Sequence, residues 1–454
     1  MSAQPKDQNR EIVTAIPGPK SVALRAREDA HLAPGAQGYG LMAGIAVERA
    51  EGSTVTDVDG NTFIDFIGGI GVGALGHSHP GFVAAVAEQV TRLSVGSFTS
   101  APRVELLERM ARHAPSNRLH RLQLYSAGTE AVESALRLAK SATGKYEFLS
   151  FWGGFHGKTM GALSLMGSTF KHGLGPMVPG SHLAPYADCY RCPIGQSYPS
   201  CGIACVEVAR GQLRNAGAGA LAAIIVEPMQ GTAGNVVPPV EFLPAVASLA
   251  REHDALLIAD EMITGLGRTG TWWGVQHSGV EPDIVTVGKA FGGGFPLSGL
   301  LTRDDIAAAK PWSNPSGSSS SYGGNALGAA AGAAALRIIE EERLPENARL
   351  VGELMLGELR AMAERYPFIG HARGAGLFLG LELVRDKKTK EPLSSRVTRR
   401  IFQECVARGL LTMSYSPHFR LQPALTLDEE TARNGLAVLR EVFDLIDREK
   451  LWHL

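Results

Sequence analysis

Between residues 122 and 287, short apolar segments and helical segments follow each other in a repeated order. Strand, helix and strand in repeated order form a largely parallel sheet with right-handed crossover connections. We therefore expect an α/β fold with one large, mostly parallel central sheet. The expected strands are 122–125, 146–150, 220–226, 255–260 and 285–287, and the expected helices between them include one that ends near Ser141 and one over 241–252.

The two ends of the chain predict a smaller α+β domain. Residues 45–66 alternate apolar and polar side chains around the turn at 57–61, which is a hairpin pattern. We expect a domain division into 1–75 (an N-terminal arm and part of the small domain), 76–334 (the large domain) and 335–454 (the C-terminal small domain). Other expected elements are helices 21–29, 80–93, 325–340, 344–366, 395–408 and 428–447, and strands 375–384 and 419–423.

Composition excludes several classes of protein. The chain has 454 residues, of which 44% are hydrophobic and 20% charged, and its formal net charge is -1. It can therefore bury a large core, and it has no basic face for nucleic acid. The polar residues 1–10 do not form a signal core, and no apolar run of about eighteen residues occurs. We expect a cytoplasmic enzyme that acts on small molecules, without a nucleic-acid or membrane partner.

Two of the expected strands end in residues that can carry chemistry. Lys289 follows the strand 285–287 and Gly288, and Asp260 and Glu261 close the strand 255–260. The carboxyl ends of neighbouring parallel strands meet at the edge where such sheets bind ligands. Pyridoxal 5'-phosphate (PLP) needs a lysine amine for a Schiff base and a carboxylate that faces its pyridine nitrogen. A strand-end lysine and a strand-end acid therefore predict PLP.

Other strand ends offer groups that suit the rest of such a cofactor. The small residues 126–129 open a helix whose free amides could bind a phosphate, although Ser126 or Thr129 could equally be an ordinary N-cap. Phe155 follows the strand 146–150 and could stack on a planar ring, although aromatic residues more often pack in the core. Glu227 follows the strand 220–226.

Two further motifs have competing interpretations. Residues 71–76 match the dinucleotide pattern G-x-G-x-x-G, but His77-Ser-His79-Pro80 stands where that pattern would open a helix, so we expect a turn. Four of the five cysteines form a C-x2-C-x8-C-x3-C pattern in one loop, at Cys189, Cys192, Cys201 and Cys205. A structural zinc site is the sharper interpretation, and reduced or redox-sensitive surface cysteines are the alternative. We predict no metal in the catalytic site.

Six segments together resemble the class III, or ω-, aminotransferases, nearest the 4-aminobutyrate branch and its racemase relatives. The resemblance extends from Val47 to the end of the chain in the family's order and spacing, and it implies the PLP-dependent transferase fold of type I. The segments are 126–131, 155–157, 227–231, 260–270, 288–289 and 322–325.

The resemblance implies roles for individual residues. Lys289 would form the Schiff base with PLP, and Asp260 would pair with the pyridine nitrogen. Arg420 would bind a substrate carboxylate through a bidentate pair. Ser321 would reach the phosphate of the neighbouring subunit, which implies a homodimer or a dimer of dimers with shared active sites. The remaining implied cofactor contacts are Ser126, Gly128, Thr129, Phe155, His156, Glu227 and Met262.

Two departures from the family pattern bear on the substrate. Thr232 stands where the branch that uses 2-oxoglutarate usually has Glu, and Ile263 stands where Gln is common. Both changes resemble enzymes that use pyruvate or glyoxylate as acceptor, or amines and β-amino acids as donor.

We therefore predict ping-pong transfer of an amino group from an ω-amino acid, or a related amine, to a 2-oxo acid. The alternative within the family is an amino-acid racemase or epimerase, because fold and cofactor do not fix which atom is reprotonated. A catalytically silent ligand-binding protein and a nicotinamide-dependent dehydrogenase are alternatives from other classes. Lys289 and Asp260 argue against the silent protein, and only the pattern at 71–76 suggests the dehydrogenase, which predicts nucleotide binding and no lysine adduct.

Overall fold

The computed structural model describes residues 10–414 and 417–454, and the chain divides into two compact units. Residues 80–346 form the larger unit. Residues up to 79 and residues 347–454 form the smaller unit. Within the described ranges, no helix is both long and apolar enough to cross a lipid bilayer.

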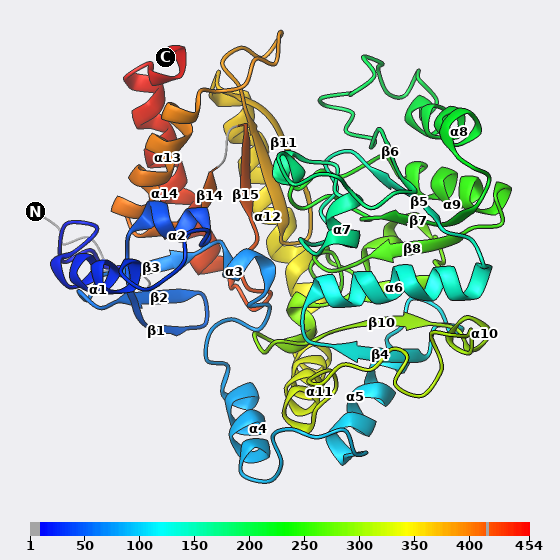
Figure 1. Ribbon diagram of the computed structural model, residues 1–454. Coiled ribbons are helices and arrows are strands. Elements are labelled where there is room, and N and C mark those ends of the chain that lie inside the picture. The colour runs from blue at the N-terminus through cyan, green and yellow to red at the C-terminus, as the bar shows by residue number, and fades with distance from the viewer. Residues whose placement is uncertain (1–9, 415–416) are drawn as a thin grey trace, which may run out of the picture. The chain divides into compact units, whose positions relative to one another are not determined.

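The larger unit is built on a seven-stranded sheet with the order β4-β10-β9-β8-β7-β5-β6 (Figure 1). All neighbours are parallel except β10, which runs antiparallel to both β4 and β9. The mostly parallel sheet is the predicted one. The strands are β4 (Arg121–Tyr125), β5 (Glu147–Phe151), β6 (Ser181–Ala184), β7 (Leu221–Val226), β8 (Leu256–Asp260), β9 (Ile284–Val287) and β10 (Ser298–Thr302).

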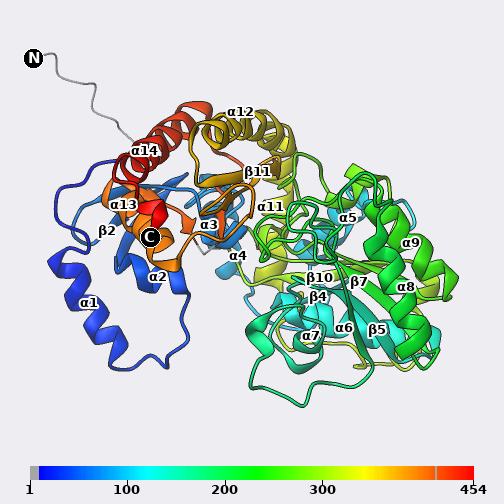
Figure 2. The ribbon, with the colours of Figure 1, turned by 90° about the horizontal axis from the view of Figure 1, so that it is seen from above.

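Helices cover both faces of this sheet. Figure 2 shows α6 (Gly128–Thr143) on one side of the strands and α8 (Ala204–Ala216) and α9 (Phe242–Glu252) on the other. Alternate residues of β7 divide between two cores, so that Ala223 and Ile225 pack toward α6, whereas Ile224 and Val226 pack toward α9. Burial on both faces explains why these strands read as continuous apolar runs.

The remaining helices of the larger unit follow the predicted pattern with shifts of a few residues at their ends. The helix predicted over 80–93 ends at Val90, and the predicted Ala-rich helix packs against α5 and α4. The elements are α4 (Pro80–Val90), α5 (Ala101–Arg112), α7 (Met160–Ser164), α10 (Asp304–Ala307) and α11 (Ala326–Glu341), with short 3-10 helices η1 (Thr169–Lys171), η2 (Gly274–Ser278) and η3 (Lys289–Gly292).

The smaller unit contains two four-stranded sheets, β1-β2-β3-β13 and β11-β12-β15-β14. The predicted hairpin is present, since β2 and β3 pair antiparallel across the turn that follows Asp57. The strands are β1 (Val47–Glu51), β2 (Thr54–Asp57), β3 (Thr62–Asp65), β11 (Ile369–Ala375), β12 (Phe378–Leu383), β13 (Leu410–Leu411), β14 (Met413–Ser414) and β15 (His418–Leu421). The helices are α1 (Pro19–Asp29), α2 (Gly38–Ala43), α3 (Gly68–Gly71), α13 (Ser395–Ala407), α14 (Glu429–Arg448) and η4 (Leu451–His453), and α12 (Leu344–Arg365) continues from one unit into the other.

The strand predicted over 375–384 is present as β12, but every one of its residues is buried, so the expected alternation of buried and exposed side chains is absent. β12 pairs antiparallel with β11, a strand that was not predicted. The glycine-rich segment 71–76 follows β3, which belongs to an antiparallel pair, and the next long helix begins only at Pro80. As expected, the segment 71–76 does not form the strand-to-helix turn of a dinucleotide site.

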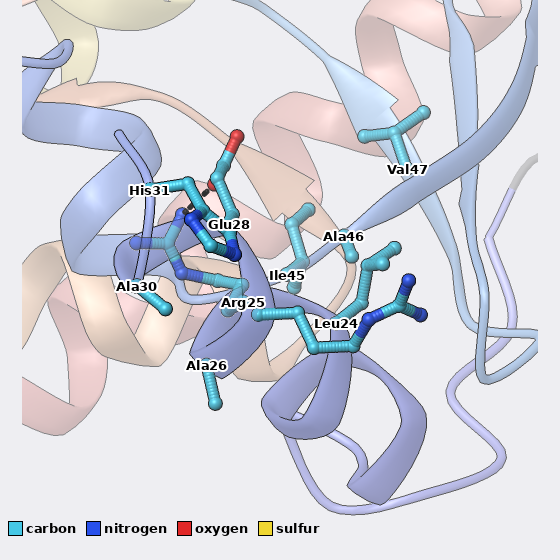
Figure 3. A pocket seen from close by; sticks show the side chains of 10 residues that line it. Leu24, Arg25, Ala26, Glu28, Ala30, His31, Ile45, Ala46 and Val47 are labelled. Atoms are coloured by element: carbon cyan, nitrogen blue, oxygen red, sulfur yellow. Dashed lines mark ion pairs between the residues drawn. The ribbon is translucent and has the colours of Figure 1, made fainter. Parts of the chain in front are cut away.

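A cavity of about 860 Å³ lies next to α1 in the smaller unit (Figure 3). Its walls come from α1, residues 30–31 and residues 45–47, and the side chain of Arg25 forms an ion pair with Glu28 at 3.5 Å. None of the predicted site residues lines this cavity.

Candidate active site

The candidate site is built at the carboxyl ends of β8 and β9. Asp260 is the last residue of β8 and pairs in register with Thr286 on β9, three residues before Lys289. Lys289 opens η3 with a backbone φ of 48°. A positive φ is uncommon for a residue with a Cβ, and such strain is often found at functional sites. The predicted acid and the predicted lysine therefore belong to neighbouring strands and the same sheet edge.

Asp260 is held by three hydrogen-bond donors. His156 Nδ1 lies 2.7 Å from Asp260 Oδ2, while Thr286 Oγ1 and the amide of Met262 each donate to Oδ1 at 3.1 Å. The side chain of Asp260 is only 1% exposed. Thr286 is not among the predicted site residues, although a threonine inside an otherwise apolar strand, two residues before Gly288, was a usable signal. The site therefore contains a buried carboxylate in a fixed orientation.

The charges around Asp260 influence each other. Burial disfavours a charged His156, but the hydrogen bond and the charge of Asp260 outweigh it and raise the pKa of His156. Burial, with the nearby Asp260 charge, raises the pKa of Glu227 to about 7, although His156 and two backbone amides oppose that rise. An imidazolium at His156 would balance the charge of Asp260 inside the protein.

Phe155 and Glu227 are linked directly. The amide of Phe155 donates to Glu227 Oε1 at 2.8 Å, and the amide of Gly231 donates to Glu227 Oε2 at 3.1 Å. The ring of Phe155 is partly buried and packs edge-on against Phe170, with centroids 5.8 Å apart. Glu227 thus fixes the loop after β5, which carries both Phe155 and His156.

The predicted phosphate contacts lie at the N-terminus of α6. Gly128 and Thr129 are its first two residues, and amides in the first turn of a helix have no intrahelical acceptor. The amides of Ser126 and Ala127 instead donate to Glu130 Oε2, each at 2.9 Å. Glu130 therefore caps the turn, and the Ser126 hydroxyl, rather than its amide, is left for the predicted phosphate contact.

Two glycines make room around Met262. A Cβ on Gly128 would lie 2.9 Å from Met262 Sδ, and a Cβ on Gly288 would lie 2.7 Å from the same sulfur. Met262 thus packs between the start of α6 and the residue before Lys289. The loop after β5 also approaches α6 closely, because a Cβ on Gly157, whose φ is 132°, would lie 2.3 Å from Thr129 Oγ1.

Glu261, the second carboxylate at the end of β8, has a structural role. Its oxygens accept the amides of Gly274 and Val275 at 2.9 and 2.8 Å, and the hydroxyl of Thr264 also donates to it. Burial raises the pKa of Glu261 to about 7. Of the two carboxylates at this strand end, only Asp260 contacts other predicted site residues.

The two remaining predicted site residues lie elsewhere in the fold. Ser321 is exposed in the loop before α11. Arg420 belongs to the smaller unit and lies on β15, where Nη2 contacts Met413 Sδ at 3.7 Å.

The four clustered cysteines line one small cavity of about 20 Å³ between β6 and α8. All carry free thiols. Burial and the neighbouring thiols raise the pKa of both Cys189 and Cys205 to about 11. Within residues 10–414 and 417–454, no group of three or more His, Cys, Asp or Glu side chains is arranged to hold a metal ion.

The residues of the larger unit fit PLP. A buried carboxylate that accepts three hydrogen bonds suits a protonated pyridine nitrogen. A lysine follows the neighbouring strand, and a helix N-terminus suits a phosphate. These groups follow β4, β8 and β9, which belong to one sheet.

Comparison with known proteins gives the same class. Residues 35–443 match the family Aminotransferase class-III. The chain is 36% identical to 5-aminovalerate aminotransferase DavT of Pseudomonas aeruginosa, over 90% of this chain and 95% of that protein. It is 34% identical both to 4-aminobutyrate aminotransferase GabT of Escherichia coli (90% and 95% covered) and to leucine/methionine racemase of Thermococcus litoralis (86% and 89% covered).

Solved structures agree. A PLP-bound amine transaminase from an uncultivated Pseudomonas species superposes with a TM-score of 0.84 at 32% identity, with 88% of this chain and 95% of that chain covered. An (S)-enantioselective ω-transaminase from Thermomicrobium roseum superposes with a TM-score of 0.86, also at 32% identity, with 93% and 99% covered.

The chain belongs to the class III aminotransferases. It is a PLP-dependent enzyme, and the predicted family, fold class and cofactor are confirmed.

Proposed function

We propose that this enzyme transfers an amino group from an ω-amino acid of the 4-aminobutyrate type, or a related amine, to a 2-oxo acid in two half-reactions. The observation that carries the proposal is the buried Asp260, bonded to His156 at 2.7 Å, at the strand end next to that of Lys289. The similarity to aminotransferases named for 5-aminovalerate and 4-aminobutyrate supports the donor class.

Each residue has a defined task in this proposal. PLP, when bound, stores the electrons released at the donor carbon and carries the amino group between the half-reactions. Asp260 holds a proton at the pyridine nitrogen, and His156 keeps Asp260 oriented. Lys289 Nζ attaches the cofactor and moves the proton at the reacting carbon. Phe155 and Met262 contact the ring, and Glu227 fixes the loop of Phe155.

The phosphate and the substrate are bound by other groups. The amides of Gly128 and Thr129 and the hydroxyl of Ser126 hold the phosphate. Arg420 binds a substrate carboxylate through paired hydrogen bonds. Because Thr232 replaces the usual glutamate and Ile263 is buried against Gly231, we propose pyruvate or glyoxylate as acceptor rather than 2-oxoglutarate.

A racemase or epimerase is the second candidate. The identity to the Thermococcus litoralis racemase equals that to the 4-aminobutyrate enzyme. In such an enzyme the proton would return to the same carbon from the opposite face, and no acceptor would be consumed.

Assembly as a homodimer, or as a dimer of dimers, is also part of the proposal. Helix α4 contains no buried residue although most of its side chains are apolar, and Phe98 is 90% exposed. Ser321 and Tyr322 are exposed in the loop before α11. A second copy of the chain would cover such a surface, and Ser321 would contact the partner's phosphate. We further propose a cytoplasmic location and the domain boundaries 1–75, 76–334 and 335–454.

The test supplies the PLP-loaded enzyme with 4-aminobutyrate, 5-aminovalerate, a simple amine or single enantiomers of amino acids, with or without a 2-oxo acid. Amino transfer and optical purity are followed together. Transfer to pyruvate or glyoxylate supports the proposal. Loss of optical purity without an acceptor would establish the racemase, and transfer to 2-oxoglutarate alone would contradict the proposed acceptor.

A further inference from the structure

The sheet of the smaller unit that carries Arg420 places a second arginine in the same cross-strand row. Arg373 on β11 pairs with Gly380 on β12, Gly380 pairs with Arg420 on β15, and Arg420 pairs with Met413 on β14. Directly paired residues of neighbouring strands point to the same face of a sheet. Both guanidinium groups therefore lie on one face, with only a glycine between them, and each arginine is 6% exposed.

The adjacent row on this face contains an acid. Glu382 pairs with His371 on β11 and with His418 on β15, so it is diagonal to both arginines. Diagonal neighbours in a sheet have Cα atoms about 7–8 Å apart, within reach of long side chains. The structure joins Glu382 Oε2 to Arg373 Nη2 at 2.8 Å and places His418 Nδ1 at 3.4 Å from the same oxygen.

We infer that the buried Arg373–Glu382 pair is a positioning and charge-setting device that determines how tightly Arg420 binds a substrate carboxylate. The inference rests on the proposed function, in which Arg420 binds that carboxylate. It adds two residues, Arg373 and Glu382, to which the family resemblance gave no role.

The physical basis is that the charges of this face are buried and therefore weakly screened. With the pair intact, the charges of Arg373 and Glu382 oppose each other, and Arg420 provides the net positive charge that a carboxylate meets. Without the negative charge of Glu382, both guanidinium groups would attract the carboxylate. Without Arg373, the carboxylate of Glu382 would compete with the substrate for Arg420.

These two losses change substrate binding in opposite directions. For Glu382→Gln we expect KM for 2-oxo acids to fall by about three- to tenfold, and for Arg373→Met we expect a rise of about the same size. The double variant should return to within about twofold of the wild type, because it removes both opposing charges. KM for an amine without a carboxylate should stay unchanged in all three.

The experiment measures KM and kcat for pyruvate and for a carboxylate-free amine with the PLP-loaded enzyme. Glu391→Gln is the matched control, because Glu391 forms an exposed ion pair with Arg385 in the same unit. Thermal unfolding of each variant separates folding from binding. If Glu382→Gln does not fold, a comparison of Arg373→Lys with Arg373→Met still tests the effect of the positive charge at position 373. Only the methionine variant should raise KM for 2-oxo acids.

Arg420→Lys distinguishes a failure of the proposed role of Arg420 from a failure of the inference about the Arg373–Glu382 pair. If this substitution leaves KM for 2-oxo acids unchanged, the proposed role of Arg420 is wrong. If it raises KM, but Glu382→Gln and Arg373→Met shift KM in the same direction or not at all, only the inference about the pair is overturned.

Discussion

Replacement of His156 by leucine removes a buried hydrogen bond to Asp260 while keeping the site filled. His156 Nδ1 lies 2.7 Å from Asp260 Oδ2, and both side chains are 1% exposed, so water cannot replace the lost donor. A hydrogen bond to a charged group contributes about 1.5–3 kcal/mol. Since about 1.4 kcal/mol corresponds to a tenfold change in rate, we expect kcat/KM to fall by about 10- to 150-fold.

His156→Asn is the matched control. Its side-chain amide retains a donor for Asp260, so we expect it to recover most of the activity lost in the leucine variant. The assay is the single-turnover half-reaction of the PLP-loaded enzyme with donor amine, together with the pH profile of that rate. Equal activity of the leucine variant and the wild type, or an equal loss in both variants, would refute the assigned role of His156.

Three further predictions concern Asp260 and its surroundings. Thr286→Val removes one of the two longer hydrogen bonds to Asp260, and we expect a loss of about 3- to 10-fold in kcat/KM; an unchanged rate would mean that this bond does not affect catalysis. Gly157→Ala places a Cβ 2.3 Å from Thr129 Oγ1, so PLP affinity and melting temperature should fall, whereas Gly144→Ala, with positive φ and no atom within 4 Å, should affect only stability. Glu261 has a raised pKa of about 7, so its contribution to stability is present at low pH and lost as the pH rises to about 8. As the pH rises to about 8, the free energy of unfolding in urea should fall by up to about 3 kcal/mol more for the wild type than for Glu261→Gln. An equal pH dependence of the free energy of unfolding in the two proteins would contradict this.

The strands that position the site were predictable because burial on both faces makes them continuous apolar runs. The segments 255–260 and 285–287 correspond to β8 and β9, and their terminal residues are Asp260 and, two positions beyond, Lys289. Such runs bounded by glycine or charged residues leave few alternatives to a parallel sheet.

Antiparallel elements of the same sheet and hairpins of buried strands were harder to predict. β10 (Ser298–Thr302) follows a glycine-rich segment and has no crossover helix before it, so the strand-helix order gives no signal for it. The hairpin of β11 and β12 has a two-residue connection after Ala375, and the full burial of β12 removes the alternation expected of a strand with one solvated face.

Side-chain partners were not predictable from strand order alone. Asp260 and Glu261 are adjacent in sequence, yet one bonds to His156 and the other to the amides of Gly274 and Val275. Adjacent residues at a strand end project to opposite sides, and only tertiary packing decides which side holds the site. For the same reason the contact between Glu382 and Arg373 could not be found from sequence spacing.

The role of Lys289 can be tested by reducing the PLP-loaded protein with borohydride, digesting it and mapping the modified peptide. We predict a single label on Lys289 in the wild type and none at that position in Lys289→Ala. A label on another lysine, or no label in a protein that retains its activity, would show that the reactive amine is not the lysine that follows β9.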